Sequence, residues 1–308
     1  MPGRGGPVGR FAPSPTGRLH LGSLLAAVAS YCHVRKQGGT WLVRMEDLDP
    51  PREVPGAAAD ILRTLEGVGL HWDGEVVFQS ERSELYQEAM EALKRDGHAY
   101  PCACSRKDWA GLPHYPGTCR SGLPDAKPAR MTRYRLSGAS QAWNDVMRGE
   151  VMWSTADMGD FPILRADGFW AYQLAVVVDD RDQGITEVIR GADLLDSTPM
   201  QLDLWGALDE AQEKVPPPAY GHVPLLETMG GQKLSKQTLA RAVETDQAVA
   251  LLDLVWGLLG QHRCEAWSST VAEDDPAALM SLAASLWNAE AVPLASIQLQ
   301  GWGQDTRP

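Results

Sequence analysis

Residues 10–23 constrain the fold of this chain more than any other stretch. A short apolar segment leads into two prolines and a glycine, and a helical pattern then covers residues 24–35. This order predicts a strand, a rigid turn and a helix N-terminus. The backbone N–H groups there, with His20 and the small pair Gly22 and Ser23, suit a phosphate chain. The alternative is that His20 only caps an ordinary helix, and this stretch alone supports both interpretations equally.

The alternation of strands and helices continues to about residue 97. Apolar runs bounded by turn residues indicate strands, and apolar residues at helical spacing indicate helices. Such alternation predicts an α/β fold with a doubly wound parallel sheet of the Rossmann type. The predicted strands are 7–12, 40–45 and 76–78, and the predicted helices are 20–36, 57–67 and 80–95, the last with Ser80 as its cap.

The alternation stops at residue 98 and resumes near residue 166. Residues 98–130 are rich in Cys, Pro and Gly, which predicts an insert held together by something other than an apolar core, and short antiparallel strands follow at 134–136, 151–154 and 161–165. The α/β segments reappear at 169–178, 186–190, 197–208 and 221–226, and the chain is mostly helical from residue 238. We therefore expect four parts: residues 1–97 and 166–239 as the two halves of the α/β domain, an inserted small zinc-binding subdomain at 98–165, and a short helical C-terminal region at 240–308.

Composition limits the location and the partners of the protein. The chain has 308 residues, 44% of them hydrophobic, but no apolar run of eighteen residues and no apolar signal region, so we expect a cytoplasmic protein without membrane contact. Its net charge of −12 argues against nonspecific nucleic-acid binding. A local basic surface remains compatible with a nucleic-acid substrate, and Arg130, Arg133 and Arg135 are candidates for it. We also expect a monomer.

A charged cluster stands where the second predicted strand ends. Arg44, Glu46, Asp47, Asp49 and Arg52 occur within nine residues there. Ligands of open α/β sheets bind outside the carboxyl ends of the strands. An unpaired carboxylate at that edge suits a substrate ammonium, and we favour Glu46 for this role. The alternative is an ion-pair network that only fixes the loop, which is a sufficient account of Arg44, Asp49 and Arg52.

A later strand ends in Arg190 and brings a guanidinium to the same edge of the sheet. Guanidinium groups bind carboxylates through two parallel hydrogen bonds. Tyr172, on the preceding helix, supplies a hydroxyl for the same pocket, although a lone tyrosine is more often a core aromatic. Arg10 and Arg190, with the Glu46 carboxylate and a phenol, suit a zwitterion with one extra negative group, which is an acidic amino acid.

A loop that contains glycines and lysines follows at residues 230–237. Lys233 and Lys236 are mobile point charges of the kind that stabilises a pentavalent α-phosphate. Two lysines in a polar loop are usually solvated surface residues. Their combination with the His20 segment makes the phosphate interpretation specific.

Three of the five cysteines, Cys102, Cys104 and Cys119, cluster in the insert. A clustered, odd number of cysteines without a signal region favours metal binding over disulfides. Three thiolates in a segment without a core predict one structural Zn²⁺ ion. The fourth ligand is open at this point, since His114 is the better donor by ligand chemistry and Tyr115 is the rarer one. The alternative is three reduced structural cysteines.

With these elements together, the chain resembles the class I aminoacyl-tRNA synthetases, and within them the glutamyl branch. The matching segments are Arg10-Phe-Ala-Pro-Ser-Pro-Thr-Gly, His20-Leu-Gly-Ser (the family's HIGH motif), Arg44-x-Glu46-Asp47-x-Asp49, Arg190-Gly-Ala-Asp193-Leu and Lys233-Leu-Ser-Lys236-Gln (its KMSKS motif). They cover the family's whole catalytic domain in the right order. Ser23 is a common variant of the first motif in this branch, whereas Leu234 and Gln237 depart from the usual Met and Ser of the second.

The resemblance implies a reaction and a set of site residues. Glutamate is activated with ATP-Mg²⁺, and His20, Lys233 and Lys236 are the implied catalytic residues. The implied ATP-binding residues are Pro13, His20, Gly22, Ser23 and Lys236. L-Glutamate is implied to bind Arg10, Phe11, Ala12, Pro13, Ser14, Glu46, Tyr172 and Arg190, with no indication of which arginine takes which carboxylate. The implied ligands of the Zn²⁺ ion are Cys102, Cys104, Tyr115 and Cys119.

Two features point to the truncated paralogues of this branch, which join glutamate to queuosine in the anticodon of tRNA(Asp). The chain ends about 70 residues after the lysine loop, where the family normally continues into a large helical anticodon-binding region, and residues 240–308 carry three basic and nine acidic side chains. The Cys-x-Cys…Tyr…Cys insert is also similar to theirs. The resemblance therefore implies tRNA(Asp) carrying queuosine as the acceptor.

Two alternatives remain at this point. The first is a shortened glutamyl-tRNA synthetase that charges the 3′ end of tRNA(Glu). The second is a non-catalytic paralogue that binds an amino acid or tRNA, against which the intact His20, Glu46 and lysine pair argue.

Overall fold

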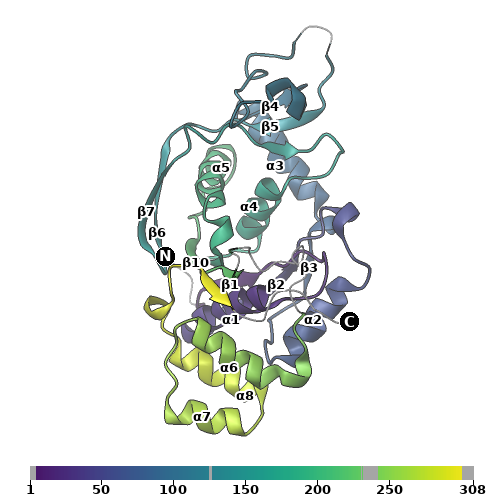
Figure 1. Ribbon diagram of the computed structural model, residues 1–308. Helices are drawn as coiled ribbons and strands as arrows, with labels where there is room; N and C mark the ends of the chain where they lie inside the picture. The colour runs from purple at the N-terminus through teal and green to yellow at the C-terminus, as the bar shows by residue number, and fades with distance from the viewer. Residues whose placement is uncertain (1–4, 125–126, 230, 232–241, 300–308) are drawn as a thin grey trace.

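A five-stranded parallel sheet forms the centre of the molecule (Figure 1). The structure is a computed structural model that describes residues 5–124, 127–229, 231 and 242–299. The strand order is β10-β9-β1-β2-β3. The strands after β1 are added on one side, as β2 and β3, and the strand after β9 is added on the other side, as β10, so the order reverses between β1 and β9. The gap between their carboxyl ends is the place where such sheets bind ligands. The strands are β1 (Val8–Phe11), β2 (Thr40–Met45), β3 (Val77–Phe78), β9 (Glu187–Gly191) and β10 (Ala219–Val223).

Helices cover both faces of this sheet, which confirms the prediction of a doubly wound α/β fold. Two large apolar cores result, one beneath the sheet in the view of Figure 1 and one above it. The lower core contains side chains of α1 (Leu21–Lys36) and α2 (Ala57–Gly67). The upper core contains side chains of α3 (Ser83–Arg95), α4 (Tyr172–Asp182) and α5 (Ser197–Ala211).

The C-terminal helices extend the lower core. Trp256 stacks on Trp267 with 4.5 Å between ring centroids and lies 6.5 Å from the ring of Trp287. A fully buried large apolar side chain contributes about 1.5–3 kcal/mol, so this tryptophan group is a substantial part of the stability of the region. Its elements are α6 (Ala248–Leu258), α7 (Glu265–Ala272), α8 (Pro276–Leu286) and β12 (Ile297–Leu299), which pairs in parallel with β11 (Leu226–Thr228).

The insert lies at the opposite end of the molecule from the C-terminal helices (Figure 1). Its antiparallel sheet has the order β4-β5-β8, and a separate hairpin, β6–β7, runs back to the central sheet, where the Val146 N–H donates to the Tyr220 carbonyl at 2.8 Å. The first predicted antiparallel strand, 134–136, is shifted, since β5 ends at Tyr134. The strands are β4 (Ala99–Cys102), β5 (Met131–Tyr134), β6 (Ser140–Asp145), β7 (Gly149–Ser154) and β8 (Pro162–Leu164).

The predicted cap of the third helix is wrong. Residues Gln79–Glu81 form a separate 3₁₀ turn, and Arg82 is the N-cap of α3. Ser80 instead donates from its backbone N–H and its hydroxyl to Asp47, at 2.9 and 2.6 Å. Ser80 therefore gives both of its hydrogen-bond donors to the carboxylate of the neighbouring loop and does not cap the helix. Among the described residues, no helix combines the length and the apolarity that a membrane crossing requires.

Candidate active site

A cavity of about 720 Å³ opens at the carboxyl ends of β1, β2 and β9. Every described residue that the sequence assigned to the ATP and glutamate sites lines it. Lys233 and Lys236 lie outside the described residues. The predicted residues that line the cavity are Arg10, Phe11, Ala12, Pro13, Ser14, His20, Gly22, Ser23, Glu46, Tyr172 and Arg190.

Arg10 and Arg44 share one buried carboxylate below the cavity. Asp180 accepts from Nε and Nη2 of Arg10 at 3.1 Å each, and it lies 2.8 Å from Nη2 of Arg44. Burial alone would raise the pKa of Asp180, but the two arginines outweigh it and hold this pKa below its ordinary value. Arg44 is completely buried and also lies 3.6 Å from Asp179. The ion-pair interpretation therefore holds for Arg44.

The loop after β2 is fixed in the same manner. Asp49 accepts from Nε of Arg52 at 2.5 Å and lies 3.3 Å from Nη1 of Arg165. Both partners are surface arginines, and such pairs contribute about 0–1 kcal/mol each. The alternative interpretation, a network that positions the loop, is thus sufficient for Asp49 and Arg52, although both also line the cavity.

Glu46 is a carboxylate that the protein itself only partly compensates. Its side chain is 11% exposed, and its nearest cation is Nη2 of Arg44 at 3.8 Å. Burial raises the pKa of Glu46 to about 7, against the opposing effect of Arg44 and Arg10. A ligand ammonium at this point would supply the missing positive charge.

Arg190 is held by neutral groups. Its Nε donates to Nε2 of His222 at 3.2 Å, its Nη1 to Oε1 of Gln201 at 2.8 Å, and its Nη2 to Oγ1 of Thr198 at 2.9 Å. No carboxylate of the described residues forms an ion pair with it. The guanidinium therefore faces the cavity with a fixed orientation and an uncompensated charge, which suits an anionic ligand.

Tyr172 is the first residue of α4, and the charges of both Glu46 and Arg190 act on its hydroxyl. Burial raises the pKa of its hydroxyl, with smaller effects of Arg190 and Glu46 in opposite directions. The phenol accordingly stays neutral and can donate a hydrogen bond to one ligand atom and accept one from another.

His20 both caps α1 and lines the cavity. The Ser23 N–H donates to Nδ1 of His20 at 3.2 Å, so His20 caps the helix as one interpretation predicted. Because His20 also lines the cavity, its position is compatible with phosphate binding as well. His20 also pairs with Ala242 in an isolated antiparallel bridge. Leu226 of β11 lines the cavity too, so both flanks of the predicted lysine loop lie beside the site.

The cysteine cluster of the insert is compact and buried. The sulfur atoms of Cys102, Cys104 and Cys119 lie within 4.8 Å of one another. The hydroxyl oxygen of Tyr115 is 3.4 Å from Sγ of Cys102 and 3.9 Å from Sγ of Cys104. With a small core of its own, the group is the centre of the subdomain. Three thiols and one oxygen converging on one point fit a tetrahedral metal site.

Several residues of the site carried no usable signal in the sequence. Asp179 and Asp180 are adjacent acids within a helix, and only their burial reveals them as counter-ions of the arginines. Asp145, whose Oδ2 lies 2.5 Å from Nδ1 of His222, and His222 itself stand in ordinary strands. Arg133 was predicted on a basic surface, but it is buried, 5% exposed, with Nε 3.3 Å from Sγ of Cys102.

The comparison with known proteins agrees with this geometry. The family described as tRNA synthetases class I (E and Q), catalytic domain, matches residues 8–111 and 123–267. The chain belongs to this family of class I synthetases.

The individual relatives are more specific. The chain is 50% identical over 302 residues to the Glutamyl-Q tRNA(Asp) synthetase of Chromobacterium violaceum, a match that covers 94% of this chain and 97% of that protein. The Glutamyl-Q tRNA(Asp) synthetase of Dechloromonas aromatica is 50% identical over 301 residues with the same coverage. These matches confirm the resemblance to the truncated branch and, with it, a ligase-type enzyme.

A solved structure supports the fold alone. The glutamate tRNA ligase of Elizabethkingia meningosepticum superimposes with a TM-score of 0.78 at 23% identity, and the match covers 95% of this chain. The chain spans 66% of that longer protein.

Proposed function

We propose that the protein activates L-glutamate with ATP to glutamyl-adenylate and transfers the glutamate to the queuosine base in the anticodon of tRNA(Asp). The observation that carries this proposal is the coexistence of Glu46 and Arg190 in one cavity. A desolvated carboxylate that lacks a full counter-ion and an arginine with only neutral partners are complementary to the ammonium and a carboxylate of one amino acid. The name of the relatives supports the acceptor.

Glutamate lies between β1, β2 and β9 in this proposal. Glu46 and Tyr172 hold its α-ammonium, and Arg10, Ser14 and Arg190 receive its two carboxylates. The segment Phe11, Ala12 and Pro13 forms the wall of the pocket. Arg10 is already paired with Asp180, whereas Arg190 keeps its full charge for the ligand.

ATP-Mg²⁺ lies across the turn that precedes α1, on Pro13, His20, Gly22, Ser23 and Lys236. The α-carboxylate of glutamate attacks the α-phosphorus, and pyrophosphate leaves as the adenylate forms. His20, Lys233 and Lys236 stabilise the charge that develops on the phosphate oxygens, and positioning supplies the remainder of the acceleration.

The second step transfers the glutamyl group. A hydroxyl of queuosine attacks the carbonyl carbon of the adenylate, the C–O bond to the phosphate breaks, and AMP leaves. The adenylate phosphate accepts the proton of the hydroxyl. This step leaves an ester between glutamate and the modified base.

We further propose that Cys102, Cys104, Tyr115 and Cys119 hold one structural Zn²⁺ ion. Tyr115 is preferred to His114 because its oxygen already lies among the thiols, while the His114 side chain packs beside Gly159. Arg133 lies 3.9 Å above the ring of Tyr115 and next to Cys102, so its charge offsets part of the negative charge of the ligand set.

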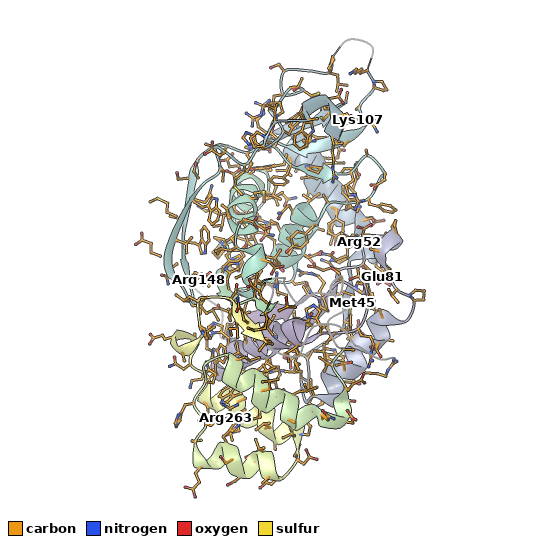
Figure 2. The ribbon with its side chains drawn as sticks, in the orientation of Figure 1. Met45, Arg52, Glu81, Lys107, Arg148 and Arg263 are labelled. Atoms are coloured by element: carbon orange, nitrogen blue, oxygen red, sulfur yellow. The ribbon has the colours of Figure 1, made fainter. Side chains whose placement is uncertain are left out.

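A basic surface of the insert supports an RNA partner. Residues 98–135 carry seven Lys and Arg side chains and two acidic ones, in a chain whose net charge is −12. Lys107, at the far end of the insert in Figure 2, is exposed, as are Arg106, Arg120, Lys127, Arg130 and Arg135. Local positive charge of this kind binds the phosphate backbone.

We propose that the enzyme acts as a cytoplasmic monomer.

A charging assay tests the proposal. The protein is incubated with ATP and labelled glutamate, first without tRNA for pyrophosphate exchange and then with tRNA(Asp) containing queuosine or with tRNA(Glu). Exchange without tRNA, and label on the anticodon fragment of tRNA(Asp) after nuclease digestion, are expected. Label on periodate-protected 3′ ends of tRNA(Glu) would identify a shortened glutamyl-tRNA synthetase, and absence of exchange would identify a non-catalytic paralogue.

A further inference from the structure

We propose that His222 and Asp145 are positioning residues that hold the Arg190 guanidinium in its glutamate-binding orientation. The inference rests on the proposed function, because it requires that Arg190 bind glutamate. His222 is not among the residues that line the cavity, and its side chain is completely buried, so it acts on the ligand only through Arg190.

The protonation of His222 follows from its neighbours. Arg190 can only donate, and its Nε lies 3.2 Å from Nε2 of His222, so Nε2 must be the unprotonated acceptor. The Thr198 hydroxyl lies at the same distance from Nε2. Nδ1 therefore carries the proton, and a neutral imidazole with this tautomer needs an acceptor on its other side.

Asp145, at the end of β6, is that acceptor. Its Oδ2 lies 2.5 Å from Nδ1 of His222, and its Oδ1 accepts from the backbone N–H groups of Met147 and Arg148, both at 3.1 Å. The carboxylate is 1% exposed and held by the turn of the β6–β7 hairpin. A chain of hydrogen bonds thus runs from this hairpin through His222 to Arg190.

The charges around the imidazole keep it neutral. Asp145 faces it from β6, Arg190 from β9, Thr198 from α5 and the Tyr220 ring from β10, and Arg148 of the hairpin turn acts on it electrostatically. Burial lowers the pKa of His222, and Arg190 and Arg148 lower it further against the opposing effect of Asp145. A neutral acceptor fixes the guanidinium without cancelling its charge, which a carboxylate in the same place would do.

The isosteric variant Asp145→Asn tests this chain. The asparagine Oδ1 still accepts from the backbone, but its NH₂ group now donates to Nδ1, so the imidazole proton moves to Nε2 and faces the N–H of Arg190. We expect the KM for glutamate in pyrophosphate exchange to rise about tenfold, while the KM for ATP stays unchanged. Glu210→Gln is the matched control, because Glu210 pairs with the partly exposed His98 away from the cavity.

A second pair of variants separates positioning from folding. His222→Gln places an amide oxygen near the former Nε2 and should keep the KM for glutamate within about threefold, whereas His222→Leu should raise it about tenfold or more. In the His222→Gln background, Asp145→Asn should add no further change, since the amide can rotate to suit either partner.

The outcomes distinguish this inference from the proposed function. If the wild-type protein shows no glutamate-dependent exchange, the proposed function fails. If the wild type is active and the variants raise both KM values equally, or only lower the melting temperature, the positioning role is overturned. A glutamate KM that is unaffected by both Asp145→Asn and His222→Leu would overturn it as well.

Discussion

The cavity at the strand ends and the cysteine cluster of the insert both bury polar side chains, but they stabilise them differently. In the cavity wall, protein groups compensate one another, as Arg10 and Arg44 do with Asp180. In the insert, three thiols converge on one point, with the side chains of Tyr115 and Arg133 beside them. The first region is therefore preorganised by its own charges, and the second is expected to depend on a metal ion.

The largest effect is expected from Lys236→Ala, which removes a charge proposed to act on the ATP phosphates. Glutamate-dependent pyrophosphate exchange should fall about 10³-fold, because the developing phosphate charge loses a stabilising cation. Metal content and melting temperature should stay at wild-type values. Lys127→Ala, an exposed lysine of the insert, is the control. Exchange at the wild-type rate in the Lys236 variant would remove that lysine from the mechanism.

Removing the proposed metal ion should unfold the insert and leave the cavity intact. A chelator, or Cys104→Ser, should raise the rate of proteolytic cleavage within residues 98–130 about a hundredfold, because the subdomain loses the binding free energy of the ion. Exchange without tRNA should change by less than about threefold, since the cavity is built by other elements. Cys264→Ser, outside the cluster, is the matched control. A metal-free preparation with an intact insert would contradict the zinc proposal.

Glu46→Gln should separate function from stability in the cavity. The KM for glutamate should rise about 30-fold, because the ammonium loses a charged partner. Since the pKa of Glu46 is raised to about 7, its ionisation opposes folding increasingly as the pH rises from about 4.5 through 7. The variant should consequently be more stable than the wild type by about 1–3 kcal/mol at pH 8 and equal to it near pH 4.

Denaturant unfolding at the two pH values measures this difference. Glu81→Gln, an exposed carboxylate (Figure 2), serves as the control and should change neither quantity. A loss of stability at pH 8 in the Glu46 variant would show that its carboxylate is satisfied by the protein rather than kept for a ligand.

The smallest effect should come from the surface of the insert. Lys107→Glu and Arg130→Glu should each weaken tRNA binding about three- to tenfold and reduce its salt dependence, because phosphate contacts release counterions. Exchange without tRNA should not change. Lys214→Glu, an exposed lysine after α5, is the control. Equal losses in all three variants would indicate a general effect of net charge instead of a defined surface.

Much of the α/β framework could be predicted from local pattern. The second strand, 40–45, and the helix 57–67 have the predicted bounds, since apolar periodicity and flanking turn residues are local signals. Ser80 shows the limit of such signals. A serine before an amphipathic helix is an ordinary cap, but Asp47 reaches it from a loop 33 residues away and takes both of its donors.

The sequence predicted which residues line the cavity, but it did not predict which charged side chains pair with one another. Glu46 and Arg190 were identified because they end strands of a parallel sheet, and both line the cavity. Arg133 was assigned to the surface because its neighbours are basic. Its burial follows from the position of β5 in the centre of a three-stranded sheet, which sequence does not reveal.

Sequence alone determined the strands and helices of the α/β domain, the kinds of side chain at the strand ends and the grouping of the cysteines, because these depend on periodicity and residue type along the chain. The tertiary structure decided which charges cancel. Arg10 meets Asp180 from 170 residues away, and His222 meets Asp145 across 77 residues. Contacts between such distant residues depend on packing, and in a buried site they decide whether an arginine is neutralised by the protein or remains charged for a ligand.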